Sequence, residues 1–206
     1  MRVYITRHGK INLEVETFFC GRKNNNDLNF KGKEEAKKTG IYFKDIPLDK
    51  IITSPMKRTV QTSVIIEQEN NRDINIFEDS RLIEIDFGVF DCKGNEEIFQ
   101  KYKKEYEIRK ENKFKFIIPE GESYEMVYER VKDFFHEIYE ENNSLLLVTH
   151  GTTLKLILYF LTELSLEEID NNYVYGNCCI FSFDLEKQGD NFISKSLLFN
   201  YLNHLK

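Results

Sequence analysis

The sequence predicts an α/β fold of three layers (α/β/α), in which helices flank a mostly parallel central sheet. Short apolar segments at 3–6, 51–53, 74–77 and 145–148 are typical of buried strands. Helical patterns alternate with these segments, as expected where parallel strands are joined by crossover helices. With 206 residues, 41% of them hydrophobic, the chain can bury one good core, so we expect a single domain over residues 1–206.

The other elements follow from local patterns. Apolar residues recur at helical spacing in 32–43 and 122–141. Ser54-Pro55 suits a helix start, with the serine oxygen as cap and proline in the first turn, and this helix should run through Ile66. The run 145–148 has no polar residue, which indicates a central strand covered on both faces, and an apolar helix follows it. Strands are expected at 178–185 and 192–199, a loop at 23–29, and a solvated helical insertion at 94–115.

Composition excludes several classes of protein. The formal net charge is −6, so a bulk basic surface for nucleic acid or anionic lipid is absent and any anion site must be local. No apolar run reaches transmembrane length and no signal peptide is apparent, so we expect a cytosolic protein with no membrane partner. The four cysteines lack CxxC spacing, and adjacent Cys178 and Cys179 fit a reduced structural pair on opposite faces of a strand.

Two predicted strands end in the same dipeptide, His8-Gly9 and His150-Gly151. Ligands of open α/β sheets bind outside the carboxyl ends of the strands, so both imidazoles should face one crevice, where helix N-termini offer N–H groups to an anion. Arg7 adjoins His8, and Arg58 lies one turn into the helix after a third strand. Singly these could be a turn, two core histidines and a surface arginine. Together they predict an anion pocket.

At these motifs the chain resembles the histidine phosphatase superfamily, in its phosphoglycerate-mutase-like branch. The resemblance covers nearly the whole chain and implies that family's fold, with a lid-like insertion at about 94–118. Six segments match in order: Arg7-His8-Gly9, Leu28–Gly32 with Ala36, Ser54–Thr62, Arg81–Gly88, Glu120–Ser123 and Val148–Gly151.

The resemblance also implies a role for each site residue. His8 is the expected nucleophile, which attacks phosphorus to form a phosphohistidine. Glu84 is the expected proton donor to the leaving group and later the base that activates water. His150 is expected to donate to the phosphoryl oxygens as an imidazolium. The expected catalytic residues are His8, Glu84, His150, Arg7 and Arg58, and the expected substrate-binding residues are Arg7, His8, Arg58, His150 and Gly151.

Competing interpretations exist for several of these residues. Asp86 is as acidic as Glu84, and only the resemblance selects Glu84. Two histidines could bind zinc, but no carboxylate or cysteine accompanies them at ligand spacing, so we predict no metal and no cofactor. The remaining histidines, His136 and His204, are expected to be solvated.

The chain departs from the family pattern after Gly9. Ile11 replaces a threonine, and Glu14 stands where the family has an asparagine that contacts the phosphoryl group. A carboxylate there would oppose phosphate unless it turns away or pairs with a cation such as Arg22, and Lys10 or Asn12 could compensate. The departure leaves the role of Glu14 open and suggests a specialised substrate.

The expected reaction is hydrolysis of a small-molecule phosphate ester. The segment 86–91 resembles the phosphatase branch, including enzymes that act on α-ribazole phosphate. The alternatives are a cofactor-dependent phosphoglycerate mutase and a phospholigand-binding protein without activity, although binding alone needs neither nucleophile nor proton donor. Phe99, Tyr102 and Tyr106 in the insertion could form a lid over substrate or an ordinary helix at the sheet edge. The sequence leaves the particular ester and the oligomeric state open.

Overall fold

Six strands form one mixed sheet in the order β3-β2-β4-β1-β5-β6 within the part of the chain that the computed structural model describes, residues 1–12, 19–172 and 175–206. The pairs from β3 to β1 are parallel, whereas β5 is antiparallel to β1 and to β6. The strands are β1 Arg2–Arg7, β2 Lys50–Thr53, β3 Asn75–Glu78, β4 Ser144–Thr149, β5 Ile180–Gln188 and β6 Asn191–Tyr201.

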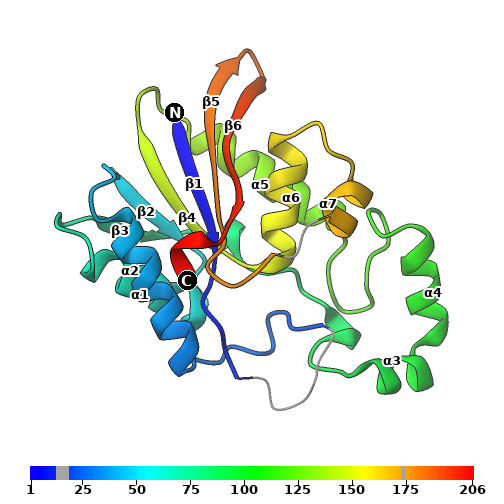
Figure 1. Ribbon diagram of the computed structural model, residues 1–206. Helices are drawn as coiled ribbons and strands as arrows, with labels where there is room; N and C mark the ends of the chain where they lie inside the picture. The colour runs from blue at the N-terminus through cyan, green and yellow to red at the C-terminus, as the bar shows by residue number, and fades with distance from the viewer. Residues whose placement is uncertain (13–18, 173–174) are drawn as a thin grey trace.

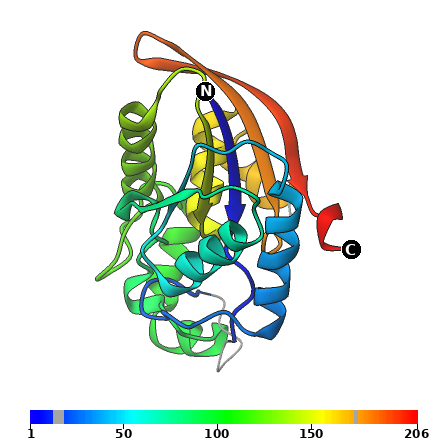
Figure 2. The ribbon, with the colours of Figure 1, turned by 90° about the vertical axis from the view of Figure 1, so that its left-hand side faces the viewer.

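Helices cover both faces of this sheet. Figure 2 shows α1 and α5 on opposite sides of it. Ile66 of α2 belongs to the same apolar cluster as Phe43 of α1, and Leu154 of α6 belongs to the same cluster as Val127 of α5. The helices are α1 Phe30–Phe43, α2 Lys57–Gln68, α3 Asn95–Lys101, α4 Lys103–Glu111, α5 Tyr124–Ile138, α6 Gly151–Leu161 and α7 Leu166–Asn172. None of the helices described is both long and apolar enough to cross a membrane.

The core is divided by the sheet into two layers of apolar side chains. Val3 and Ile5 of β1 belong to the cluster that contains α5 and α6, and Tyr4 between them belongs to the cluster that contains α1 and α2. Leu147 and Val148 of β4 separate in the same way. Successive residues of a strand point to opposite faces of the sheet. A strand that is covered by an apolar layer on each face therefore needs apolar residues at every position. The three-layer α/β prediction is therefore confirmed.

Two local predictions need correction. Helix α2 begins at Lys57, and its cap residue, Met56, makes no side-chain capping bond. Ser54 lies before the cap position, and its hydroxyl accepts from the Met56 amide (3.4 Å) and lies 2.7 Å from a ring nitrogen of His150. The cysteine pair precedes β5 instead of lying in it, since Cys178 has φ of 54° and breaks the extended backbone. Even so, Cys178 and Cys179 enter different apolar clusters, and both are fully buried.

The insertion forms the two helices α3 and α4, at the end of the molecule where β1 finishes (Figure 1). Most of its residues are exposed, as predicted for a solvated helical insertion, but Ile98 is 1% exposed and the Arg109 guanidinium lies over the Phe19 ring. Tyr102 and Tyr106 pack edge-on against Phe90. The insertion is therefore attached to the core through aromatic contacts.

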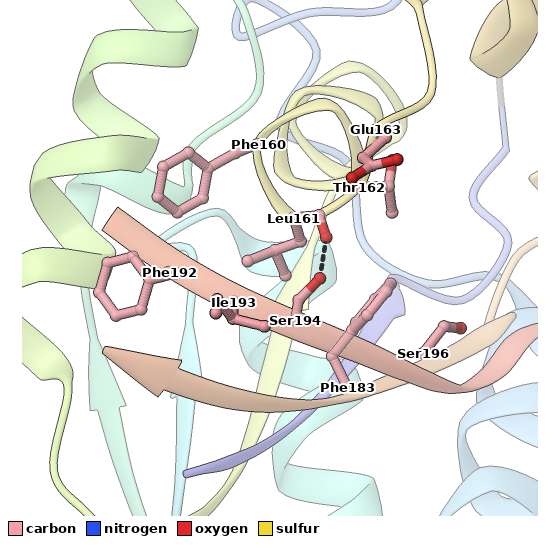
Figure 3. Close-up of a pocket in the computed structure, with 9 residues that line it drawn as sticks. All are labelled: Phe160, Leu161, Thr162, Glu163, Phe183, Phe192, Ile193, Ser194 and Ser196. Atoms are coloured by element: carbon pink, nitrogen blue, oxygen red, sulfur yellow. Dashed lines mark hydrogen bonds between the residues drawn. The ribbon is translucent and has the colours of Figure 1, made fainter. Parts of the chain in front are cut away.

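A cavity of about 430 Å³ lies between α6 and β6 (Figure 3). Phe160, Phe183 and Phe192 line it, and the Ser194 hydroxyl donates to the carbonyl of Leu161 at its centre. None of the side chains predicted to form the anion site lies on its wall. The predicted anion site is therefore separate from this cavity and belongs at the carboxyl edge of the sheet.

Gly32 lets the start of α1 approach the segment that follows β1. A Cβ atom at Gly32 would lie 2.0 Å from the carbonyl oxygen of Lys10, and one at Gly9 would lie 2.4 Å from the carbonyl oxygen of Gly32. We expect Gly32→Ala to lower the free energy of unfolding by about 1–3 kcal/mol, because backbone must move to admit the methyl group. Denaturant titration measures this. Lys33→Ala, at an exposed position of the same helix, is the control, and equal stability of the two variants would contradict the prediction.

Candidate active site

The site begins with the main-chain pairing of three adjacent strands. β4 lies between β1 and β2, and the register pairs Arg7 with Thr149. The pairing continues one step further, since the His8 amide donates to the Thr149 carbonyl (2.9 Å) and the Ser54 amide donates to the Val148 carbonyl (3.0 Å). His8, His150 and Ser54 therefore follow the ends of three adjacent strands. The centroids of the two histidine rings lie 5.3 Å apart.

His8 is held as a neutral ring whose Nε2 has no hydrogen-bond partner among the described residues. Its Nδ1 lies 2.7 Å from the Gly9 carbonyl, which can only accept, so Nδ1 carries the proton and Nε2 keeps its lone pair. Burial, reinforced by the charges of Arg7 and Arg58, holds the pKa of His8 well below its usual range. The main chain is fixed as well, because Asn177 donates to the His8 carbonyl (2.9 Å). An unprotonated, oriented imidazole is the form that a nucleophile needs.

His150 lies behind His8, fully buried between Ser54 and Arg58. Arg58 Nε donates to His150 Nδ1 (3.0 Å), so the proton of the ring is on Nε2, which lies 2.7 Å from the Ser54 hydroxyl. Burial and the Arg58 charge lower the pKa of His150 well below its usual range. This geometry holds a neutral ring. The imidazolium predicted for a phosphoryl complex would require Arg58 to release Nδ1.

Arg58 also organises the loop that follows the first site segment. Its two terminal nitrogens donate to the carbonyls of Asn24 and Gly21, and the side chain is 1% exposed. Burial lowers the pKa of Arg58. The guanidinium therefore connects the 21–24 loop to His150 directly beneath the cavity.

The Glu84 carboxyl group occupies the N-terminus of α6. Its oxygens accept from the amides of Thr152 and Thr153 (both 3.2 Å) and from the amide of Ile85 (3.0 Å). The N–H groups that we expected this helix to offer to a bound anion are thus taken by a side chain. Glu84 is 5% exposed, and these bonds hold its carboxyl group in one orientation at the wall of the crevice.

A cavity of about 140 Å³ lies over these groups. Arg7 Nη1 donates to the Tyr175 carbonyl (2.8 Å), while its Nε is buried with no hydrogen-bond partner among the described residues. A Cβ atom on Gly151 would lie 3.7 Å from the Arg7 guanidinium and 3.8 Å from a Glu84 oxygen, so Gly151 lies close to both groups. The described lining is Arg7, His8, Lys10, Ile11, Cys20, Glu84 and Asn177.

The structure thus brings the predicted site residues together, in two layers. Arg7, His8 and Glu84 line the cavity, with Gly151 between Arg7 and Glu84, and the buried pair Arg58 and His150 lies behind His8. Contact of the deeper pair with a phosphoryl group stays a prediction.

Other residues differ from their predictions or were not predicted. Glu14 lies outside the described residues, and Arg22, its suggested partner, pairs with Glu122 (2.6 Å). His204 is not solvated: it lies 3.1 Å from the Thr39 hydroxyl, and burial lowers its pKa to about 4. His136 is half-buried against the Phe192 ring. Sequence reasoning assigned no site role to Thr62, Thr152, Thr153 or Asn177. Thr62 lies in the matched segment Ser54–Thr62, and the Thr-Thr pair follows the second His-Gly, whereas Asn177 has no local signal.

Asp86, the competing carboxylate, turns away from the cavity. Its Oδ1 accepts from the amide of Gly88 (2.8 Å), a bond that closes the turn after Glu84. Across residues 1–12, 19–172 and 175–206, no group of three or more His, Cys, Asp or Glu side chains is arranged to hold a metal ion.

A sheet of this order with a cationic, imidazole-containing cavity at its carboxyl edge is the architecture of an α/β enzyme that binds an anion. The family model for the histidine phosphatase superfamily (branch 1) matches residues 3–196. The chain therefore belongs to the histidine phosphatase superfamily, in the phosphoglycerate-mutase-like branch.

Curated relatives include both hydrolases and a mutase. The chain is 29% identical over 171 residues to a 6-phosphofructo-2-kinase/fructose-2,6-bisphosphatase of Aquarana catesbeiana, with 81% of this chain and 34% of that protein covered. It therefore spans about a third of the length of that relative. It is 28% identical over 169 residues to a 2,3-bisphosphoglycerate-dependent phosphoglycerate mutase of Cytophaga hutchinsonii, with 80% and 79% covered.

Solved structures agree on the fold. YhfR of Bacillus stearothermophilus superposes with a TM-score of 0.87 at 24% identity, over 100% of this chain and 99% of that one. The α-ribazole phosphatase of Shigella flexneri superposes with a TM-score of 0.80 at 21% identity, over 98% and 96%.

The two site histidines should stay neutral across the physiological pH range. With pKa values depressed by burial and by neighbouring guanidinium groups, they take up protons only at a pH well below about 6.5. We expect the ¹³C ring signals of His8 and His150, assigned with single substitutions, to show no titration between about pH 8 and pH 6. The urea-unfolded protein, whose histidines titrate near pH 6.5, is the reference. A native midpoint near 6.5 for either ring would contradict the assignment.

Proposed function

We propose that this enzyme is a phosphomonoesterase that acts on a small-molecule phosphate ester through a phosphohistidine at His8. The observation that carries the proposal is the state of the His8 ring: neutral, oriented through Nδ1, and free at Nε2 within the cavity that Glu84 and Arg7 also line. A nucleophile, a carboxyl group and an unpaired cationic donor at one small cavity support covalent phosphoryl transfer.

In the first half-reaction, the Nε2 lone pair of His8 attacks phosphorus and the ester P–O bond breaks. The leaving oxygen takes a proton from the Glu84 carboxyl group, so the alcohol departs neutral. Arg7 Nε, which lacks a partner among the described residues, would donate to a non-bridging oxygen and stabilise the charge that spreads over the phosphoryl group.

In the second half-reaction, the Glu84 carboxylate removes a proton from water, whose oxygen attacks the phosphohistidine. The N–P bond breaks, phosphate leaves and His8 regains its lone pair, while Glu84 is protonated again. Proton and charge balance close over the cycle with no other reactant, because the same carboxyl group serves as acid and then as base.

Arg58 and His150 act on the phosphoryl group from beneath in this proposal. All three donor nitrogens of the Arg58 guanidinium bond protein groups in the structure, and both ring nitrogens of His150 are engaged. Binding of a phosphoryl dianion would therefore exchange these bonds for bonds to phosphate oxygens. A charge-assisted bond to phosphate is stronger than a bond to a neutral carbonyl, which favours the exchange.

Substrate choice is proposed from the size and surroundings of the cavity. A volume of about 140 Å³ suits a phosphoryl group with a short adjoining segment, so the rest of the substrate would extend past Lys10 and Ile11. We propose that residues 94–118, within a single domain over 1–206, form a lid above this exit, since α4 is attached through Arg109 to Phe19, next to the cavity residue Cys20. α-Ribazole phosphate is one candidate ester. The proposed compartment is the cytosol, whose reducing conditions agree with the four free cysteines.

Hydrolysis is proposed over phosphoglycerate mutation, because the turn Asp86–Asp91 follows the pattern of the phosphatase branch. The mutase alternative has its own support, since the Cytophaga hutchinsonii mutase aligns over most of both chains. A mutase must keep water from the phosphohistidine, whereas a phosphatase must admit it. Stimulation of 3- to 2-phosphoglycerate exchange by bisphosphoglycerate, at a rate above that of phosphate release, would identify a mutase.

The covalent intermediate gives the most direct test. Mixing enzyme with a ³²P-labelled phosphate ester and denaturing within milliseconds at alkaline pH should trap label on the protein, at His8. We expect His8→Ala to abolish the trapped label and to lower kcat about 1,000-fold or more. His136→Ala is the matched control, because that ring lies on α5 against Phe192. Undiminished hydrolysis by His8→Ala would eliminate the assigned nucleophile.

A panel of phosphate esters addresses the substrate. It should contain α-ribazole phosphate, phosphoserine, sugar phosphates and phosphoglycerates, each measured by phosphate release. We expect one group of related esters to exceed the others in kcat/KM by about 100-fold, as when a site pairs polar groups that the others lack. Turnover of none of them, together with tight binding of inorganic phosphate, would favour a phospholigand-binding protein instead.

A further inference from the structure

Three charged side chains form a network beside Glu84 that the proposed mechanism does not use. Arg22 Nη2 donates to Glu122 Oε2 (2.6 Å), and Arg130 Nη2 lies 3.6 Å from the same oxygen. The side chains of Glu122 and Arg130 are each 15% exposed, and that of Arg22 is 29% exposed. One carboxylate is therefore shared by two guanidinium groups in a largely buried setting, where an unpaired charge is costly.

Each member of this network also holds the main chain around the proposed proton donor. Arg22 Nε donates to the carbonyl of Glu84 itself (2.7 Å), and Arg130 Nη2 donates to the carbonyl of Ile83 (2.7 Å). Glu122 Oε2 accepts from the amide of Asp86 (3.1 Å). The main chain from 83 to 86 is thus fixed by side chains from two distant segments, the 21–24 loop and residues 122–130, which lie at the entry to α5 and within it.

This arrangement makes the position of the Glu84 carboxyl group depend on charge balance elsewhere. Its carboxyl end is fixed by the N-terminus of α6, and its main-chain end is fixed by Arg22. Burial lowers the pKa of Arg130 to about 10, an effect that the Glu122 charge opposes. Without the Glu122 charge, Arg22 and Arg130 would repel each other, and at least one would leave the carbonyl that it holds.

We propose that Glu122 and Arg22 are positioning residues that keep the Glu84 carboxyl group aligned with the leaving-group oxygen. This inference rests on the proposed function, in which Glu84 donates that proton. Proton donation depends on geometry within hydrogen-bond reach, and a shift of about 1 Å in a supporting group can cost about 100-fold in rate. Neither residue lines the cavity, so the effect must pass through Glu84.

The dependence of kcat/KM on the leaving group distinguishes the positioning role of Glu122 and Arg22 from a general loss of structure. p-Nitrophenolate leaves readily without protonation, whereas an alkoxide requires it. We expect Glu122→Gln to lower kcat/KM at least about tenfold for glycerol 2-phosphate and less than about threefold for p-nitrophenyl phosphate. Arg22→Lys, which keeps the charge but not the fork that bonds both Glu84 and Glu122, should show the same asymmetry. Glu129→Gln, at an exposed position of α5, is the matched control and should change neither rate.

A double-substitution cycle completes the test. In a Glu84→Gln background the asymmetry should disappear, because Glu122→Gln then has no proton donor to displace. Equal losses on both esters, or an asymmetry that persists in the Glu84→Gln background, would overturn the positioning role. If Glu122→Gln fails to fold in a thermal melt, Arg22→Lys decides the outcome alone. Should Glu84→Gln itself treat both esters alike, the proton-donor assignment in the proposed function fails instead, and the two failures are thereby distinguished.

Discussion

The main-chain pairing of β1 with β4 is the constraint on which the rest of the site depends. The register that places Arg7 opposite Thr149 also places His8 and His150 at the same height beyond the sheet edge, and the bond from the His8 amide to the Thr149 carbonyl extends that pairing into the site. Because side chains alternate along a strand, a slip of one residue would turn His8 to the other face and reverse the packing of both core layers. The apolar layers that stabilise the fold therefore also fix the position of His8, the proposed nucleophile.

The site gathers cations in a protein whose formal net charge is −6. Arg7, Arg58 and two imidazoles lie in or beneath one cavity, and burial would make three or four positive charges there expensive. The structure limits the cost in two ways. Both imidazoles are neutral, with pKa values lowered first by burial and then by the neighbouring guanidinium groups. The deeper guanidinium, that of Arg58, is bonded to carbonyl oxygens of the 21–24 loop, so its donors are satisfied before a substrate arrives.

The sequence predicted the framework of this protein well because framework signals are local and repeated. Apolar runs and helical periodicity indicated the strands and the main helices, and the two His-Gly pairs indicated which strand ends would meet. Prediction was weaker where long-range contacts decide the outcome. Ser54 resembles a helix cap in isolation, but its hydroxyl lies against His150, 96 positions away. His204 resembles a solvated tail residue, but the C-terminal segment returns to α1 and buries it against Thr39. No pattern within a short window contains such contacts.

The N-terminus of α6 shows how the same elements can serve a different purpose from the expected one. Helix N-termini that follow a strand commonly receive phosphate, and the glycine at 151 suggested such a role. Here the amides of Thr152 and Thr153 instead hold the Glu84 carboxyl group. Because these amides already bond Glu84, the proposed function places the anion on Arg7 and the groups beneath His8 instead of on the helix N-terminus. In the proposed mechanism, the N-terminus of α6 orients the carboxyl group that transfers protons, and the guanidinium groups stabilise the negative charge of the phosphoryl group. The helix N-terminus and the arginines would thus serve separate tasks at the one cavity that Arg7, His8 and Glu84 line.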